Sequence, residues 1–156
     1  MSKNPRFRGD FLLGCNPAQI LWYYKNMKKR VTAIVTHGKN ILLIYRFKNG
    51  EEYYVFPGGG VEEGESVEEA LLRELEEETG IIASLMMPLC VYKNDRLEYF
   101  FHVPCSDVET KLGGPEVDRQ SEANIYRLEW IPFNKIKDLP LVPTEMKDWV
   151  VEKFTE

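Results

Sequence analysis

The sequence predicts an α/β fold in which a mixed β-sheet lies between helices. Three observations lead to this prediction. Strand-like apolar runs come first, one strongly capped helix lies in the middle of the chain, and further strands precede a terminal amphipathic helix. Elements in this order bury their apolar faces when helices cover the sheet.

The first half of the chain predicts one short helix and three strands. Asn16 is a good capping residue and Pro17 fits the first helical turn, so a helix is expected over 17–28. Apolar runs follow, and a His-Gly-Lys-Asn turn joins the first two runs into a hairpin. The expected strands are 31–36, 41–45 and 53–56.

The central helix is the most clearly marked element. Ser66 and Glu69 form a capping box at its start, and Gly80 is the glycine that commonly follows the end of a helix. Between these limits, apolar residues recur at helical spacing and predict one buried face. They are Val67, Leu71, Leu72 and Leu75.

The second half predicts three strands, a long loop and a terminal helix. The polar segment 104–124 is long for a loop, and loops of such length are usually functional or mobile. The last helix is expected over 144–154, with Thr144 as its cap and an apolar face turned to the core. The expected strands are 82–92, 97–103 and 125–131, and the core face of the last helix consists of Met146, Trp149, Val150 and Phe154.

Composition predicts one globular domain over residues 1–156. Hydrophobic residues make up 44% of the chain, which is enough for a core without disulfide or metal staples. No apolar run approaches the ~18 residues of a membrane span. The three cysteines fit no zinc spacing and suit a reducing compartment, so the expected location is the cytoplasm. Residues 1–30 form a basic extension, but the net charge of -5 argues against stable nucleic-acid binding.

The stretch from Gly59 to Ile81 carries the predicted chemistry. Glu74, Glu77 and Glu78 stand at i, i+3 and i+4 of the central helix and therefore share one face. Like charges at this spacing repel each other, and a divalent cation would turn that repulsion into coordination. Magnesium prefers such oxygen ligands and combines them with the phosphates of a substrate.

This stretch resembles the Nudix box, the signature of the Nudix hydrolase family, at every specified position. The resemblance implies the Nudix fold, an α/β/α sandwich with a mixed β-sheet and a catalytic loop-helix-loop. It also implies that water attacks a phosphorus atom of a diphosphate linkage, with Mg²⁺ as the cofactor and Mn²⁺ as a substitute. The matching residues are Gly59, Glu65, Arg73, Glu74, Leu75, Glu77, Glu78, Gly80 and Ile81.

The resemblance also implies roles for single residues. Glu77 and Glu78 would hold the metal as exposed ligands without a role in the core. Glu74 would be a further ligand or the base, and the carbonyl of Gly59 would complete the metal's ligands. Arg73 would orient the neighbouring carboxylates through charge-assisted hydrogen bonds.

The segment 104–124 is expected to supply the remaining groups of the site. Several Nudix enzymes use a glutamate on a loop before a late strand as the general base, and Glu116 and Glu122 hold such positions here. Arg119 lies between them and could bind a phosphate in bidentate fashion.

Marks of the substrate outside the box are weak. Tyr53, Phe56 and Trp130 could stack on a nucleotide base, although the core is their usual place. ADP-ribose hydrolases of the family tend to have a proline beyond the box, and its absence at residues 95–97 disfavours ADP-ribose. Tyr99 lies near a tyrosine that dinucleoside-polyphosphate hydrolases tend to have.

The leading hypothesis is therefore hydrolysis of a nucleoside triphosphate or a dinucleoside polyphosphate. Two alternatives stay open. The first is removal of diphosphate from an RNA 5′ end, which the acidic charge and the lack of a basic-aromatic stripe weigh against. The second is a non-catalytic module that senses a nucleotide, but such modules usually lose box glutamates, and this chain keeps them. The expected partner is a small nucleotide, with no membrane, and a homodimer is an open expectation.

Overall fold

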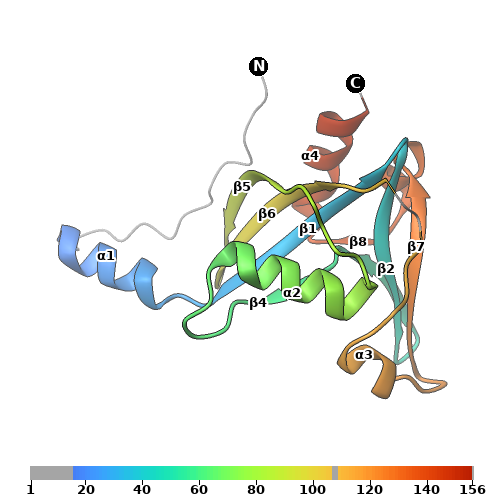
Figure 1. Ribbon diagram of the computed structural model, residues 1–156, viewed down its shortest axis with the longest axis horizontal. Coiled ribbons are helices and arrows are strands. Elements are labelled where there is room, and N and C mark those ends of the chain that lie inside the picture. The colour runs from blue at the N-terminus through green and yellow to red at the C-terminus, as the bar shows by residue number, and fades with distance from the viewer. Residues whose placement is uncertain (1–15, 107–108, 156) are drawn as a thin grey trace.

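The computed structural model describes residues 16–106 and 109–155, in which one eight-stranded mixed sheet is flanked by helices (Figure 1). The strands are β1 (Lys29–His37), β2 (Asn40–Lys48), β3 (Glu51–Val55), β4 (Gly58–Gly60), β5 (Met87–Lys93), β6 (Leu97–Pro104), β7 (Asn124–Pro132) and β8 (Leu141–Val142). The helices are α1 (Pro17–Asn26), α2 (Val67–Thr79), α3 (Pro115–Asp118), α4 (Thr144–Phe154) and the 3₁₀ helix η1 (Phe133–Asp138).

The sheet opens beside its central strand, β1. On one side, β6 pairs in parallel with β1 from Lys29 to Thr36, which is all of β1 except its last residue. On the other side, β4 pairs with the start of β1, whereas β2 pairs only with its last two residues. Strand β2 then diverges and pairs with β3 and β7. The sheet therefore has two halves, joined by the β1–β2 hairpin and splayed apart at the other end.

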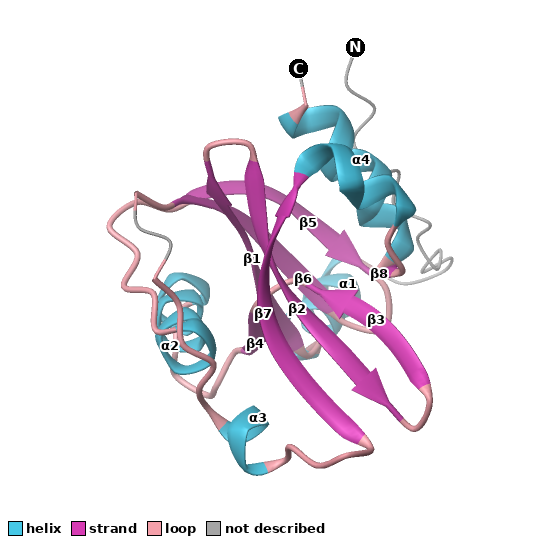
Figure 2. Cartoon of the chain, turned by 90° about the vertical axis from the view of Figure 1, so that its right-hand side faces the viewer, coloured by secondary structure: helices cyan, strands magenta, loops and turns pink. Residues whose placement is uncertain are grey.

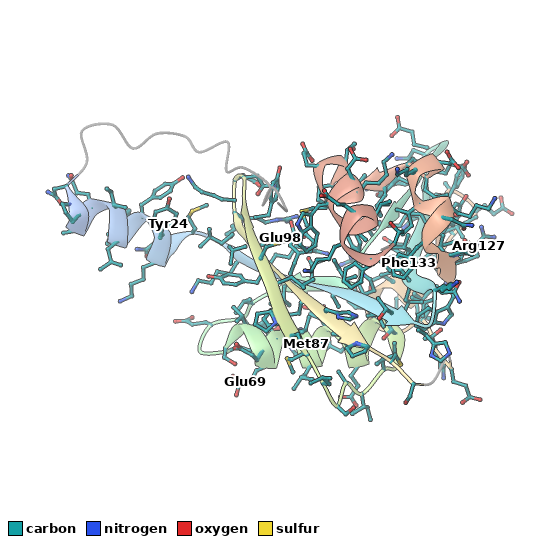
Figure 3. All side chains as sticks on the ribbon, turned by 90° about the horizontal axis from the view of Figure 1, so that it is seen from above. Tyr24, Glu69, Met87, Glu98, Arg127 and Phe133 are labelled. Atoms are coloured by element: carbon teal, nitrogen blue, oxygen red, sulfur yellow. The ribbon has the colours of Figure 1, made fainter. Side chains whose placement is uncertain are left out.

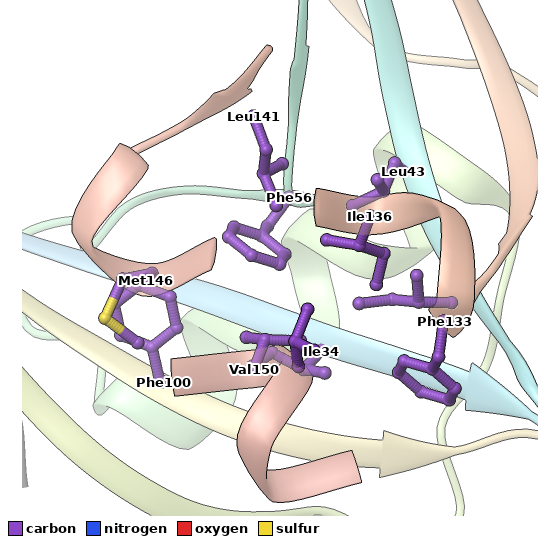
Figure 4. Close-up of a cluster of buried hydrophobic side chains, with 11 residues drawn as sticks. Ile34, Leu43, Phe56, Phe100, Phe133, Ile136, Leu141, Met146 and Val150 are labelled. Carbon is purple, nitrogen blue, oxygen red and sulfur yellow. The ribbon is translucent and has the colours of Figure 1, made fainter. Parts of the chain in front are cut away.

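Helices cover both faces of this sheet, as the α/β/α prediction requires (Figure 2). Alternate residues of β1 point to opposite faces. Val31 and Ala33 pack in a cluster with Leu71 and Leu75 of α2. Ile34 belongs to the other cluster, which α4 and η1 cover (Figure 4). That cluster consists of Ile34, Ile41, Leu43, Phe56, Phe100, Phe133, Ile136, Leu141, Met146, Val150 and Val151.

Several expected elements or element boundaries differ from the structure. Strand β5 begins at Met87 rather than at residue 82, because the segment before it is irregular and leaves Ile82 81% exposed. The segment 104–124 is not a plain loop, since it contains α3. Thr144 is the first residue of α4, and Pro143 stands at the cap without a side-chain hydrogen bond. The glycine triplet 58–60, expected to lie outside any strand, forms β4.

The helix expected over 17–28 is present as α1, two residues shorter. Its capping box is formed by Asn16 with Gln19, and Pro17 occupies the first turn. None of its residues is buried, and Leu21 and Trp22 are largely exposed. Within the described ranges, no helix combines the length and the apolar character needed to cross a bilayer. Cys15 and the basic residues before it lie outside the described residues.

Candidate active site

The site is built on α2, whose two ends are fixed by capping residues. The Ser66 side chain accepts a hydrogen bond from the Glu69 N–H, and the Glu69 carboxylate accepts one from the Ser66 N–H. Gly80 ends the helix with a positive φ of 72°, a conformation that favours glycine. The apolar face of α2 is buried against β1, and Glu74, Glu77 and Glu78 line the cavity beside β4.

Arg73 binds several groups of the loop and the helix together. Its Nε lies 2.8 Å from Glu65 Oε1, and its Nη1 lies 2.8 Å from Glu74 Oε1 and 3.4 Å from Glu77 Oε2. Nη2 also donates to the Gly60 carbonyl at 3.0 Å. The hydrogen bond from Arg73 lowers the pKa of Glu65 to about 2, with help from a backbone N–H. This arrangement fits the orienting role that the resemblance implies for Arg73.

Glu78 is buried, contrary to the expectation that it is exposed. Only 9% of its surface is accessible, because β4 lies over it and the Gly58 N–H donates to its Oε2 at 2.8 Å. Burial is the main cause that raises the pKa of Glu78 to about 8, and the nearby charges of Glu116 and Glu74 contribute to this rise against the lowering effect of the Gly58 N–H. Glu77, in contrast, is half exposed, with 49% of its side chain accessible.

The glycines of β4 permit close contact between the strand and the carboxylates. A Cβ on Gly59 would lie 2.2 Å from Cδ of Glu74, and a Cβ on Gly58 would lie 2.1 Å from the Val31 carbonyl oxygen. Real side chains cannot approach so closely. Gly60 has nothing within 4 Å of such a Cβ, so steric need for glycine is confined to the first two positions.

The segment before α3 is fixed to the end of α2. The Gly113 N–H donates to the Glu78 carbonyl at 3.1 Å, and the Lys111 N–H donates to the Thr79 carbonyl at 2.9 Å. These bonds satisfy carbonyls that a helix end leaves without partners. They also place Glu116 of α3 at the cavity, where its Oε2 is buried without a hydrogen-bond partner.

The carboxylates face a cavity of about 370 Å³, a size typical of small-molecule sites. The lining residues are Arg30, Ile44, Arg46, Val55, Phe56, Gly58, Gly59, Glu62, Arg73, Glu74, Glu77, Glu78, Pro115, Glu116 and Tyr126. The structure thus brings together the predicted residues Gly59, Arg73, Glu74, Glu77, Glu78, Glu116 and Phe56.

Four predicted residues do not line this cavity: Arg119, Glu122, Tyr53 and Trp130, the last of which packs against the core cluster under α2. Arg119 and Glu122 are exposed, and Arg119 ends α3 with its carbonyl accepting from the Asn124 side chain. Tyr53 lies beside Arg46, whose guanidinium is 5.6 Å from its ring centre. Phe56 lines the cavity but is also a core residue that packs edge-on against Phe100.

Two further arginines that line the cavity, Arg30 and Arg46, were not predicted. Arg46 of β2 lies 4.2 Å from the ring centre of Tyr126 and donates to its hydroxyl. Arg30 of β1 donates to the Gly58 carbonyl at 3.0 Å. Arg46 is the one charged residue in the apolar run 41–47, and a lone charge in such a run indicates a candidate functional residue. Arg30 ends a run of lysines, which reads as an ordinary solvated surface.

The donors around the cavity suit a hard divalent cation. They are carboxylates, and Gly59, whose carbonyl the resemblance makes a further ligand, lies among them at a position where a Cβ would collide with Glu74. In the described part of the chain, no three acidic, histidine or cysteine side chains are already grouped as a metal site. Arg73 holds Glu74 and Glu77 in ion pairs, which a cation would have to replace in part.

Comparison with known proteins assigns the chain to a family. The NUDIX domain profile matches residues 27–151, so this chain belongs to the Nudix family. A MutT structure reported for Aliivibrio salmonicida and Vibrio cholerae superposes with a TM-score of 0.62 at 25% identity, covering 81% of this chain and 95% of that one. The fold expected from the box is therefore confirmed.

Two relatives carry names that describe an activity. The ADP-ribose pyrophosphatase of Methanocaldococcus jannaschii is 45% identical over 106 residues, which are 65% of this chain. An RNA pyrophosphohydrolase of Sphingopyxis alaskensis is 38% identical over 69 residues, which are 44% of this chain. The matched part spans 63% and 42% of the lengths of these two relatives.

Proposed function

We propose that this chain is a divalent-metal-dependent pyrophosphohydrolase that cleaves a diphosphate linkage in a nucleotide. One observation carries the proposal: carboxylates and arginines line the same cavity. Glu74, Glu77 and Glu78 stand on α2, while Arg30 and Arg46 come from β1 and β2. Arginine binds phosphate oxygens, and carboxylates bind the cation that accompanies them.

The three glutamates and the carbonyl of Gly59 would hold Mg²⁺ or Mn²⁺. When bound, the cation neutralises phosphate charge and lowers the pKa of water. Arg73 keeps the carboxylate of Glu74 oriented through its 2.8 Å ion pair. Arg30 and Arg46 neutralise charge on the diphosphate and fix its position, so that the phosphorus atom faces the glutamates.

Glu116 is the strongest candidate for the general base. It lines the cavity, and its Oε2 has no partner and could accept a proton from the attacking water. Glu74 already shares its Oε1 with Arg73, and Glu122 is exposed outside the cavity. Glu116→Gln should therefore lower kcat by at least about 100-fold with little change in KM. Steady-state kinetics of Glu116→Gln and Glu122→Gln would decide between the two, and equal activity in both variants would refute this assignment.

Nucleoside triphosphates and dinucleoside polyphosphates are the first substrates to test. ADP-ribose is a second candidate, although the residues after the box disfavour it, because the relative that is 45% identical is named as an ADP-ribose pyrophosphatase. Both classes place a diphosphate next to a nucleoside. RNA 5′ ends belong in the same panel because of the shorter match to an RNA pyrophosphohydrolase.

The test is hydrolysis across this panel, with Mg²⁺ or Mn²⁺ and with a chelator. The products report the bond cleaved: a nucleoside triphosphate yields a monophosphate and pyrophosphate, and ADP-ribose yields AMP and ribose 5-phosphate. We expect metal-dependent turnover of at least one substrate, and its loss in Glu77→Gln. Binding of a nucleotide without any turnover would instead support the sensor alternative, and turnover in excess chelator would refute the metal dependence.

A further inference from the structure

A buried carboxylate lies behind the cavity without lining it. Glu98 of β6 is 4% exposed, and Figure 3 labels it near the start of this strand. Its Oε1 accepts a hydrogen bond from the Thr32 hydroxyl at 2.6 Å and lies 3.5 Å from Nε of Arg30. A carboxylate so deeply buried is costly unless it is paired and hydrogen-bonded, and these two residues of β1 provide both.

Arg30 connects this carboxylate to β4. Its Nη2 donates to the Gly58 carbonyl at 3.0 Å, and the Gly58 N–H donates to Oε2 of Glu78 at 2.8 Å. The contacts therefore run from Glu98 through Arg30 and Gly58 to Glu78. Four elements contribute one residue each: β6, β1, β4 and α2.

The path also crosses the sheet. Arg30 and Thr32 share the face of β1 that carries Ile34, which lies in the cluster covered by α4. Glu78 belongs to α2, on the opposite face. Only a residue without a Cβ can link them, since a Cβ on Gly58 would collide with the Val31 carbonyl. Gly58 thus offers its carbonyl to one face and its N–H to the other.

Arg30 also lines the cavity, so its orientation has two consequences. A guanidinium is a planar fork whose donors point in fixed directions. When Glu98 pairs with Nε and the Gly58 carbonyl accepts from Nη2, the plane of the guanidinium is fixed. The edge of the guanidinium that faces the cavity is then fixed as well. Without Glu98, the same charge could still enter the cavity but would be free to rotate away.

We propose that Glu98 is a positioning residue, which fixes the Arg30 guanidinium so that it grips a substrate phosphate and supports Gly58 beside Glu78. The inference rests on the proposed function in one respect, namely that the ligand is a nucleotide with a diphosphate. Glu98 touches neither the cavity nor the substrate. It acts through Arg30, and the two residues should therefore behave as one unit in binding and turnover.

A double-mutant cycle tests this dependence. Glu98→Gln keeps the shape but removes the charge, and Arg30→Lys keeps the charge but removes the fork. We expect Glu98→Gln to lower kcat/KM by about 5- to 20-fold and Arg30→Lys by about 10- to 50-fold, mainly through KM. The double variant should be no worse than Arg30→Lys alone, because the carboxylate has nothing further to hold. If the fold losses in kcat/KM of the two single variants multiply in the double variant, the inference is overturned.

Thr32 and Glu129 provide the controls. Thr32→Val removes the hydroxyl donor to Glu98 at nearly constant volume, whereas Thr32→Ser keeps it, so only the valine variant should lose activity. Glu129 on β7 resembles Glu98 in accepting from a hydroxyl, that of Tyr54, and in pairing with an arginine, Arg127, but none of these three lines the cavity. Glu129→Gln should retain wild-type kcat/KM. A loss in Glu129→Gln equal to that in Glu98→Gln would overturn the inference, because it would show a general effect of removing a sheet carboxylate.

A binding measurement separates this inference from the proposed function. The probe is adenosine 5′-(α,β-methylene)diphosphate with Mg²⁺, measured by calorimetry on the full chain. In one outcome, no substrate is turned over, the Glu98 and Arg30 variants each bind the probe more weakly, and their losses of affinity do not multiply in the double variant. The inference then stands and the proposed function fails. If wild type hydrolyses a nucleotide and Glu98→Gln matches it in both assays, the inference fails and the function stands. A wild-type chain that neither binds the probe nor turns over any substrate overturns both.

Discussion

At the scale of single residues, local spacing identified one side of the candidate site and missed the other. The glutamates of α2 are three and four positions apart, so helix geometry alone places them on one face. Arg30 bonds a partner 28 positions away in the chain, and Arg46 one that is 80 positions away. No periodicity connects residues so distant, and only the folded sheet brings them to the cavity.

The burial of Glu78 has a measurable effect on stability. Because the folded chain raises this pKa from 4.5 to about 8, it holds the proton more tightly than the unfolded chain does. Without metal, the free energy of unfolding should therefore fall as pH rises from about 4.5 to about 8. Glu78→Gln cannot ionise, so at pH 8 the metal-free variant should exceed wild type by an amount on the order of a few kcal/mol. Denaturant unfolding at pH 5 and pH 8 with a chelator measures this, and a variant that gains nothing at the higher pH would contradict it.

Gly59 and Gly60 offer a comparison within one strand. In Gly59→Ala the new Cβ would displace the Glu74 carboxylate, whereas in Gly60→Ala it would meet open space. We expect turnover to fall at least about 10-fold in the first variant and to stay within about twofold in the second, with similar melting temperatures for both. Equal turnover in the two variants would show that displacement of the Glu74 carboxylate does not affect activity.

At the scale of elements, boundaries were predictable where capping residues or strong alternation mark them. Ser66 and Gly80 delimit α2 as expected. Strand β4 was missed because glycine has a low preference for strands, and its three residues pair only because β1 lies beside them. The early start expected for β5 came from apolar residues that prove to be exposed, with Leu85 at 52%. Tertiary pairing, rather than local preference, decides such elements.

The two capping boxes should differ in their contribution to stability. Ser66→Ala removes the cap of a helix that is packed against the sheet, and it should lower the free energy of unfolding by about 1 kcal/mol. Asn16→Ala removes the equivalent cap of α1, which buries none of its side chains, and global unfolding should change by less than about 0.3 kcal/mol because α1 can fray independently. Chemical denaturation of both variants would check this, and an equal loss would mean that α1 unfolds together with the sheet.

At the scale of the whole molecule, we expect the acidic cavity to make the stability of the folded state depend on cations. A cation that binds only the folded chain raises its stability by mass action. Mg²⁺ or Mn²⁺ at millimolar concentration should therefore raise the melting temperature of wild type by several degrees, and much less that of Glu77→Gln. Thermal unfolding across a range of metal concentrations measures the shift. An identical rise in both would place the cation elsewhere.

The splayed sheet divides the cavity between two structural units. The glutamates and the glycine strand belong to the half around β1, whereas Arg46 and Tyr126 belong to the half formed by β2 and β7. The hairpin after β1 joins these halves through only two residue pairs. A substitution on β2 or β7 can thus alter which nucleoside fits without disturbing the carboxylates of α2. Under the proposed function, cleavage chemistry and substrate choice would in this sense be separately adjustable.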